Sequence, residues 1–139
     1  MSETRFGNRY RPNKVCIDAY AGGVPEGRIY QYNSEFEDGV CFHGAIEFLK
    51  CMEWMMKAVN APDCQDYRTF QQIDAIELNK PSNTVKRTGK KATFVVNILF
   101  RQHSSWQGTV LWCEKNKEIS FRSVLELLLL MDSAVRGDE

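Results

Sequence analysis

The sequence predicts an α+β fold: a two-layer structure in which an antiparallel sheet carries two helices, built from two β-β-β-α pseudo-repeats. The first observation behind this prediction is that "VPEGRIYQY" at 24–32 and "SWQGTVLW" at 105–112 each follow a short apolar run and precede a polar turn. The second is that each is followed by a helical stretch that starts with phenylalanine. Two pairs of residues mark the repeat: Gly27 with Gly108, 81 positions apart, and Phe42 with Phe121, 79 positions apart. The two-residue difference falls in the turn before the helix, where deletions are tolerated.

The second half shows the pattern most clearly. "ATFVVNILF" (92–100) alternates so that one face carries large apolar side chains, which is typical of a strand. The polar turn "RQHSS" leads to a second strand over 106–114, and "KNK" leads to a short third strand over 118–120. From Ser120 onward apolar residues recur at three- and four-residue steps, which predicts a helix that ends before Gly137.

The first half repeats this order. We expect its strands over 14–20, 28–32 and 40–41, its turns over 21–27 and 33–39, and its helix over about 44–59, before Pro62. Residues 67–78 alternate enough to form an extra strand or its edge. We therefore expect a single domain over 1–139, with pseudo-repeats at 14–59 and 92–136 and a connecting strand and basic linker over 60–91.

Both helices begin with the spacing of a capping box. Gly44 stands three residues before Glu47, and Ser123 stands three residues before Glu126. At this spacing the glutamate accepts a hydrogen bond from the N-cap amide and complements the helix dipole. We therefore interpret both glutamates as helix caps rather than as a pair of catalytic carboxylates.

The composition indicates a globular protein, with 43% hydrophobic and 26% charged residues. No apolar run approaches the roughly 20 residues of a membrane helix, and the N-terminus has no apolar core of a signal peptide. Five cysteines without a C-x-x-C pair suit a reducing compartment and small buried hydrophobes better than a zinc site. We expect a cytoplasmic protein with no metal, no cofactor and no membrane contact.

A formal net charge of zero hides an uneven distribution. Residues 1–14 and 79–91 hold 9 of the 18 basic residues and one of the 18 acidic residues, so the rest of the chain carries 9 basic and 17 acidic residues. The basic side chains that we consider candidate contacts are Arg5, Arg9, Lys86, Arg87, Lys90 and Lys91. Two basic strips on an acidic body can bind phosphate or an acidic protein patch. The alternative is a solvated tail and a solvated linker.

A second candidate surface is "RQHSSWQG" at 101–108. Trp106, beside Arg101, Gln102 and Gln107, can stack on a base or on an aromatic side chain of a peptide. The alternative is an aromatic residue at a strand end that packs on the core.

The sequence lacks the motifs of the common enzyme classes. It contains no Walker-type or dinucleotide-type glycine loop and no G-x-S-x-G nucleophile elbow. His43 is placed where a general base is feasible, near a helix N-terminus, but neither it nor His103 has an evident nucleophile beside it. We therefore assign no catalytic residues.

Both predicted helices carry more apolar residues than one packed face needs. In the second helix, Leu127 to Leu130 follow one another and point about 100° apart, so they cover every side of the helix. At least one of them must meet the other helix, a second chain or a partner protein. We expect a homodimer or larger assembly unless the two helices satisfy each other.

Two resemblances accompany these patterns. "RFGNR" (5–9) followed by "DAYAGG" (18–23) resembles the R-x-x-x-R…D/N-x-S-x-x-G pattern of PilZ cyclic-di-GMP receptors, with Arg5, Arg9, Asp18 and Gly23 matching and Tyr20 in place of the serine. The predicted helical repeats do not resemble a PilZ barrel. The stretch 92–135 resembles the core of a group of short uncharacterised bacterial proteins, F-R-Q-x-x-S-W-Q-G-T-V…F-R-S-x-L-E-L, and this resemblance implies a bacterial origin without an activity.

Three functions follow as hypotheses. The first is a small non-enzymatic regulator that acts by protein–protein contact, for example an inhibitor of a host defence nuclease. The alternative is a nucleic-acid-binding module that uses the basic segments 5–14 and 80–91. A cyclic-dinucleotide receptor is the remote third.

Overall fold

The fold is taken from a computed structural model, which describes residues 12–32, 34, 36–58, 70, 80–81, 86–102 and 105–136. The extra strand expected over 67–78 lies outside the described residues, apart from Phe70. Cys64 also lies outside them, and the other four cysteines are free thiols.

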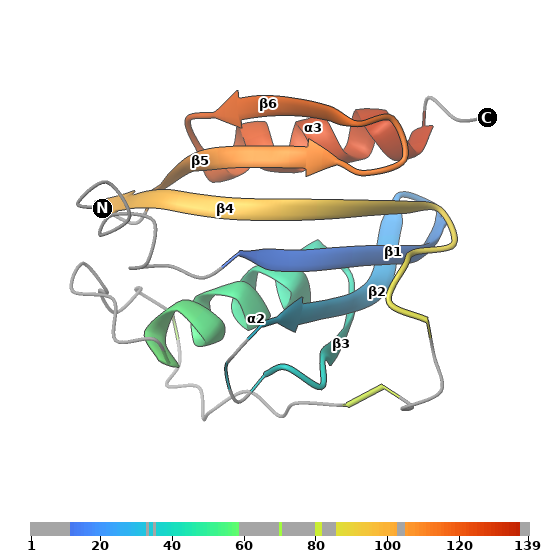
Figure 1. Cartoon of the computed structure of the whole chain (residues 1–139), viewed down its shortest axis with the longest axis horizontal. Helices are drawn as coiled ribbons and strands as arrows, with labels where there is room; N and C mark the ends of the chain where they lie inside the picture. Colours follow the sequence, from blue (N-terminus) through green and yellow to red (C-terminus); the bar gives the residue numbers. More distant parts are fainter. Residues whose placement is uncertain are drawn as a thin grey trace.

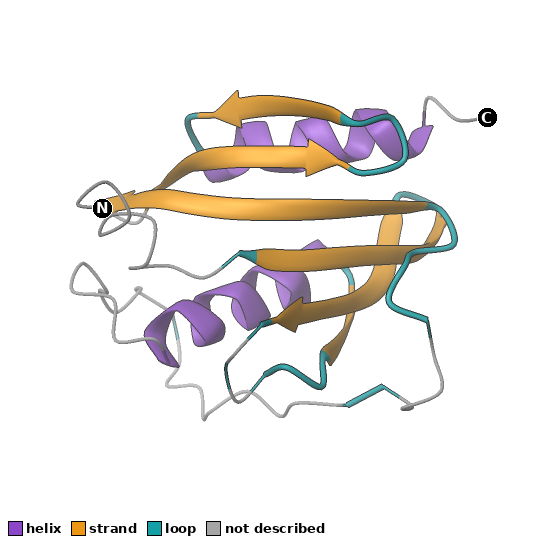
Figure 2. Ribbon diagram, viewed as in Figure 1, coloured by secondary structure: helices purple, strands orange, loops and turns teal. Residues whose placement is uncertain are grey.

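The chain forms one antiparallel six-stranded sheet with two helices, which confirms the predicted α+β class (Figures 1 and 2). The strands are β1 (Asn13–Ala21), β2 (Val24–Gln31), β3 (Val40–His43), β4 (Ala92–Gln102), β5 (Ser105–Trp112) and β6 (Lys117–Phe121). The helices are α2 (Ala45–Ala58), after β3, and α3 (Val124–Arg136), after β6. The order across the sheet is β3-β2-β1-β4-β5-β6.

In each half of the chain, the three strands follow one another in sequence order from the centre of the sheet to its edge. The first strands of the two halves, β1 and β4, pair with each other in the middle, with Lys14 opposite Val95. A β-bulge interrupts β1 between Ile17 and Ala19, and another interrupts β4 at the matching place, around Leu99. A common ancestral unit predicts such matched pairing; the duplication itself stays a prediction.

Several boundaries differ from those expected. β2 begins at Val24 rather than at Arg28, because the turn between β1 and β2 needs only Gly22 and Gly23. Both glycines have positive φ (63° and 79°), as a two-residue type I′ hairpin turn requires. α3 begins at Val124 rather than at Ser120, since the residues from 117 to 121 form β6.

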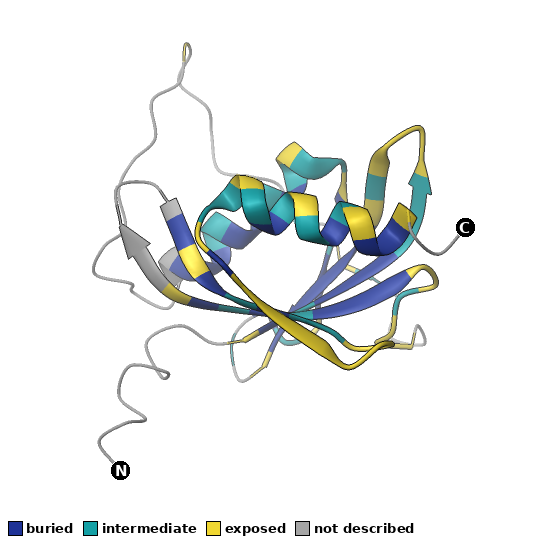
Figure 3. Cartoon of the chain, turned by 90° about the horizontal axis from the view of Figure 1, so that it is seen from above, coloured by how far each residue is buried: buried dark blue, intermediate teal, exposed yellow. Residues whose placement is uncertain are grey.

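Both helices cover the same face of the sheet and turn their buried sides toward it (Figure 3). α2 packs against β2 and β3, and α3 packs against β4, β5 and β6. The side chains of both halves join in one apolar core, which includes Ile17, Ile29 and Phe94. Burial of such a side chain is worth about 1.5–3 kcal/mol, so this shared layer is the main source of stability. No helix among the described residues is long and apolar enough to cross a membrane.

Candidate functional site

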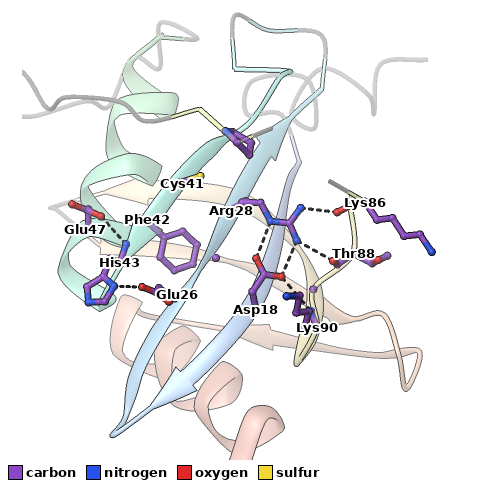
Figure 4. Close-up of a pocket in the computed structure, with 13 residues that line it drawn as sticks. Asp18, Glu26, Arg28, Cys41, Phe42, His43, Glu47, Lys86, Thr88 and Lys90 are labelled. Carbon is purple, nitrogen blue, oxygen red and sulfur yellow. Dashed lines mark hydrogen bonds and ion pairs between the residues drawn. The ribbon is translucent and has the colours of Figure 1, made fainter. Parts of the chain in front are cut away.

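The outer face of the sheet, opposite the helices, carries a group of ionisable side chains from β1, β2 and β3. Ile29 points into the core, so its neighbour Arg28 points outward. Across the β2–β3 pair, Glu26 lies opposite His43 and Arg28 lies opposite Cys41. The four side chains of this pair of strands, together with Asp18 and residues 81, 86 and 88–90, help to line a pocket of about 740 Å³ (Figure 4).

Arg28 is the centre of this face. Its side chain is only 5% exposed and makes a bidentate ion pair with Asp18, at 2.8 and 2.9 Å. It also donates to the hydroxyl of Tyr30 and to the carbonyl oxygens of Lys86 and Thr88. A guanidinium has five N–H donors, so all of them have acceptors here. Arg28 therefore holds protein groups together and has no donor left for a ligand.

The electrostatics agree with this structural role. Burial disfavours the charged form of Arg28, but hydrogen bonds to Asp18 and Tyr30 and the charge of Asp18 outweigh it and raise the pKa of Arg28 above its ordinary value. Removing one partner of such a buried pair typically costs about 3–5 kcal/mol, because the other charge is left uncompensated. Arg28 therefore holds Asp18, Tyr30 and the backbone carbonyl groups of residues 86 and 88 in place.

Two of the groups that Arg28 contacts belong to the end of the basic linker expected within residues 60–91. Besides the two carbonyl groups bound by Arg28, the amide of Gly89 donates to Thr93 Oγ1, that of Lys90 to Asp18, and that of Lys91 to the carbonyl of Ile17. The backbone of residues 86–91, here called the basic strap, is therefore docked on the sheet. The expectation of a solvated linker does not hold for the backbone of these residues, because groups of β1, β2 and β4 bind it.

The cationic side chains of the basic strap stay outside. Lys86, Arg87, Lys90 and Lys91 are all exposed, and Lys86 extends away from the pocket (Figure 4). Arg87 lies over the ring of Tyr30, with its guanidinium carbon 4.5 Å from the ring centre. The predicted basic cluster is thus brought together on a fixed backbone.

The other wall of the pocket belongs to the start of α2. His43 contacts Glu26 through Nδ1, and its backbone amide donates to Glu47 at 2.6 Å. The amide of Arg122 donates to Glu126 in the same way, at 2.8 Å. Both glutamates are caps, as predicted, but each accepts from the residue before the N-cap. In α2 this is because the amide of Gly44 already donates to the carbonyl of Pro25.

The pocket contains one thiol, that of Cys41, and its surroundings do not activate it. Cys41 lies on the same face as His43, but burial raises the pKa of its thiol, while the nearby Arg28 only partly opposes this. A protonated thiol is a weak nucleophile. Among the described residues, no group of three or more histidine, cysteine, aspartate or glutamate side chains is arranged to hold a metal ion.

Trp106 is not a surface stacking residue. It is 1% exposed, on the helix-facing side of β5, and its Nε1 donates to Glu53 of α2 at 2.8 Å. The stacking prediction is wrong because Trp106 shares a face with Gly108 and Val110, which point to the core. The alternative, packing on the core, is what the structure shows.

The remaining candidates of that surface do not form one site with Trp106. Gln107 is exposed and points to the opposite face of the sheet. Arg101 and Gln102 lie in β4, where their backbones pair with Trp106 and Ser105, and their side chains lie outside the described part of the chain.

The N-terminal candidates Arg5 and Arg9 also lie outside the described residues. Of the PilZ-like pattern, Asp18 and Gly23 are described. Both carboxylate oxygens of Asp18 are bound by Arg28, and Gly23 belongs to the hairpin turn. Both positions therefore have structural roles in the described part of the chain, Asp18 in the ion pair and Gly23 in the turn.

A second surface lies on the helical layer. A crevice of about 190 Å³ separates the start of α2 from α3, and its walls include Phe48, Leu128 and Leu129. Of the four consecutive leucines, Leu127 is fully buried, Leu128 and Leu130 are partly buried against the core, and Leu129 is 58% exposed. One turn earlier, Leu125 is 65% exposed. The surplus apolar surface expected from the sequence is therefore present on α3.

The sequence matches no protein-family model, and no curated protein or solved structure shows significant similarity to it. The site must therefore be interpreted from its own geometry.

The sequence interpretation missed Arg28 and Tyr30, and it considered Asp18 only as part of the PilZ-like pattern. A signal was available, since Asp18 and Arg28 are opposite charges on two successive predicted strands, each next to apolar residues. Such residues are rarely buried unless they are paired. The pairing of β1 with β2 is what joins them.

Proposed function

We propose that this protein is a small non-enzymatic binding protein, a regulator or inhibitor that acts by contact with another protein through the α2–α3 crevice. The observation that carries the proposal is the exposure of Leu125 and Leu129, 65% and 58%, on a helix whose other side is satisfied by the sheet. Leaving such side chains in water is unfavourable, and apolar surface of this kind marks interaction sites.

The shape of the crevice defines the partner's chemistry. A volume of about 190 Å³ with mostly apolar walls holds a single large apolar side chain. Leu129 stands at its edge, and Asp132, paired with Arg136, supplies a polar rim. This combination of an apolar pocket and a polar rim is typical of sites that receive one anchoring residue of a partner protein. The proposed partner therefore presents a leucine or aromatic side chain from a protein segment.

The test compares two variants of α3 that add the same charge. Leu129→Glu places a carboxylate beside the crevice, whereas Ser133→Glu places one on an exposed site of the same helix away from it. Immobilised wild-type protein is expected to retain a partner from a lysate of the source organism at high salt. The Ser133→Glu variant should retain the same partner, and the Leu129→Glu variant should lose it.

Two results contradict the proposal. One is a partner that binds Leu129→Glu as well as wild type. The other is a wild-type dimer, seen by light scattering, that Leu129→Glu converts to a monomer, because the occupant is then a second copy of this chain.

A further inference from the structure

We propose that the basic strap, residues 86–91, is a preformed surface for the phosphate groups of a nucleic-acid strand. It contacts Arg28 on the outer face of the sheet, and none of its residues lines the α2–α3 crevice, so it is independent of the protein contact proposed above. Within these six residues, four carry a positive charge and none carries a negative charge.

The backbone of the basic strap is held at five polar groups. Arg28 binds the carbonyl oxygens of Lys86 and Thr88, at 2.6 and 3.0 Å. The amides of residues 89, 90 and 91 donate to Thr93, Asp18 and Ile17. Gly89 lies so close to the sheet that a Cβ there would be 2.0 Å from the carbonyl oxygen of Ala92 and 2.6 Å from the amide nitrogen of Ile17.

This fixation matters for affinity. A flexible basic loop must be ordered when it binds, and that ordering reduces the net binding free energy. Here the backbone is ordered on folding, while the side chains of Lys86, Arg87, Lys90 and Lys91 remain exposed. The cations are therefore presented at fixed intervals before any ligand arrives.

The surrounding charges direct an anion to this surface. Asp18, the acidic group closest to the basic strap, is neutralised by its bidentate pair with Arg28. Glu26 and Glu47 lie on the opposite wall of the pocket, where they contact His43 (Figure 4). Outside residues 1–14 and 79–91, the chain carries 17 acidic and 9 basic residues. A polyanion is thus repelled by this acidic remainder of the chain and attracted to the basic strap.

The composition of the basic strap favours phosphate over an acidic protein patch. Its uncharged members are Thr88 and Gly89, so it offers no apolar side chain. Protein interfaces usually have an apolar centre within a polar rim. A phosphate backbone offers charges in series and needs no apolar contact. The basic strap has the properties of the second kind of surface.

The experiment measures binding of a fluorescent single-stranded DNA, and of the matching duplex, by anisotropy at several salt concentrations. Four phosphate contacts predict a slope of log K against log salt near −2.8 for the single strand, or a loss of about 50-fold between 50 and 200 mM salt. A variant with Lys86, Lys90 and Lys91 changed to Ser should reduce the magnitude of the slope by about 2.

The matched control changes three exposed lysines elsewhere, Lys50, Lys115 and Lys117, to Ser. It lowers the net charge by the same amount and should leave the slope nearly unchanged. Equal losses in both triple variants would show that net charge alone attracts the DNA, and would overturn the proposal. Absence of binding by wild type at 50 mM salt would do the same.

A third variant tests the fixation. The double variant Asp18→Asn, Arg28→Gln removes both members of the ion pair that docks the basic strap but no exposed cation, so it should weaken binding severalfold while the salt slope stays the same. Its melting curve shows whether the domain remains folded, and the lysine variants decide the proposal if it does not. Finally, poly-glutamate is added as a competitor at equal charge concentration. If it displaces the DNA completely, the surface is specific for acidic protein and the nucleic-acid assignment is wrong.

Discussion

Gly27 and Gly108 make the same backbone contact in the two halves of the sheet. A Cβ at Gly27 would lie 1.8 Å from the carbonyl oxygen of Cys16, and a Cβ at Gly108 would lie 1.8 Å from that of Asn97. Each glycine pairs with an isoleucine on one side, Ile17 or Ile98, next to a β-bulge. The two contacts explain why glycine is needed at both positions, where two adjacent strands approach each other closely beside a β-bulge.

Replacing either glycine with alanine is therefore expected to destabilise the protein by a similar amount. We expect at least about 2 kcal/mol for each of Gly27→Ala and Gly108→Ala, because the backbones must separate to admit the methyl group. Chemical denaturation measures this loss. Gly22→Ala is the control, since a Cβ there meets no atom within 4 Å and only the positive φ is unfavourable. A loss at Gly22 equal to the other two would contradict the explanation.

The hydrogen bond between Trp106 and Glu53 gives a second prediction. Trp106→Phe removes the hydrogen bond to the partly buried carboxylate of Glu53 and leaves a smaller ring in a fully buried position, so the free energy of unfolding should fall by about 1–3 kcal/mol. Trp112→Phe is a matched control, because the buried Nε1 of Trp112 has no hydrogen-bond partner among the described residues. The loss at Trp112 should be smaller. DNA binding should be the same in both variants, and a selective loss of binding in Trp106→Phe would restore the stacking hypothesis.

The basic strap should contribute to stability through its backbone and not through its charges. Changing Lys86, Arg87, Lys90 and Lys91 to Ser should alter the melting temperature little, since exposed charges contribute at most about 1 kcal/mol each. Gly89→Ala should lower it clearly, because the added Cβ meets the backbone of Ile17 and Ala92. Thermal melting of the two variants decides this. The opposite ranking would show that the basic strap is not docked.

The cap of α3 predicts a dependence on pH. The hydrogen bond from the backbone amide of Arg122, followed by the side chain of Arg122, holds the pKa of Glu126 below its ordinary value of 4.5. Because the folded pKa is lowered, the stabilisation by the carboxylate is present above pH 4.5 and is lost as the pH falls through the folded value. Wild type should therefore melt above Glu126→Ala at neutral pH, and the gap should shrink below pH 4.5. A gap independent of pH would contradict this role of the charge.

The sequence by itself determined the type and order of the elements. The alternation in 92–100 and the three- and four-residue steps after Phe121 are local patterns, and local periodicity follows from the geometry of a strand or a helix. The capping glutamates, Glu47 and Glu126, were predictable for the same reason, since a cap and its helix are neighbours in the chain. The surplus of apolar residues in α3 was likewise visible in the sequence.

Only the tertiary structure decided which of these residues are available to a partner. Arg28 and the carbonyl of Lys86 are 58 residues apart, so nothing local joins them or shows that the basic strap is docked. Trp106 is buried because Glu53 and the core lie over its side of β5. Among four identical leucines, Leu129 is the exposed one because the sheet lies on the side of Leu127. Exposure depends on what the rest of the chain covers, and that is a property of the packed molecule, not of any segment.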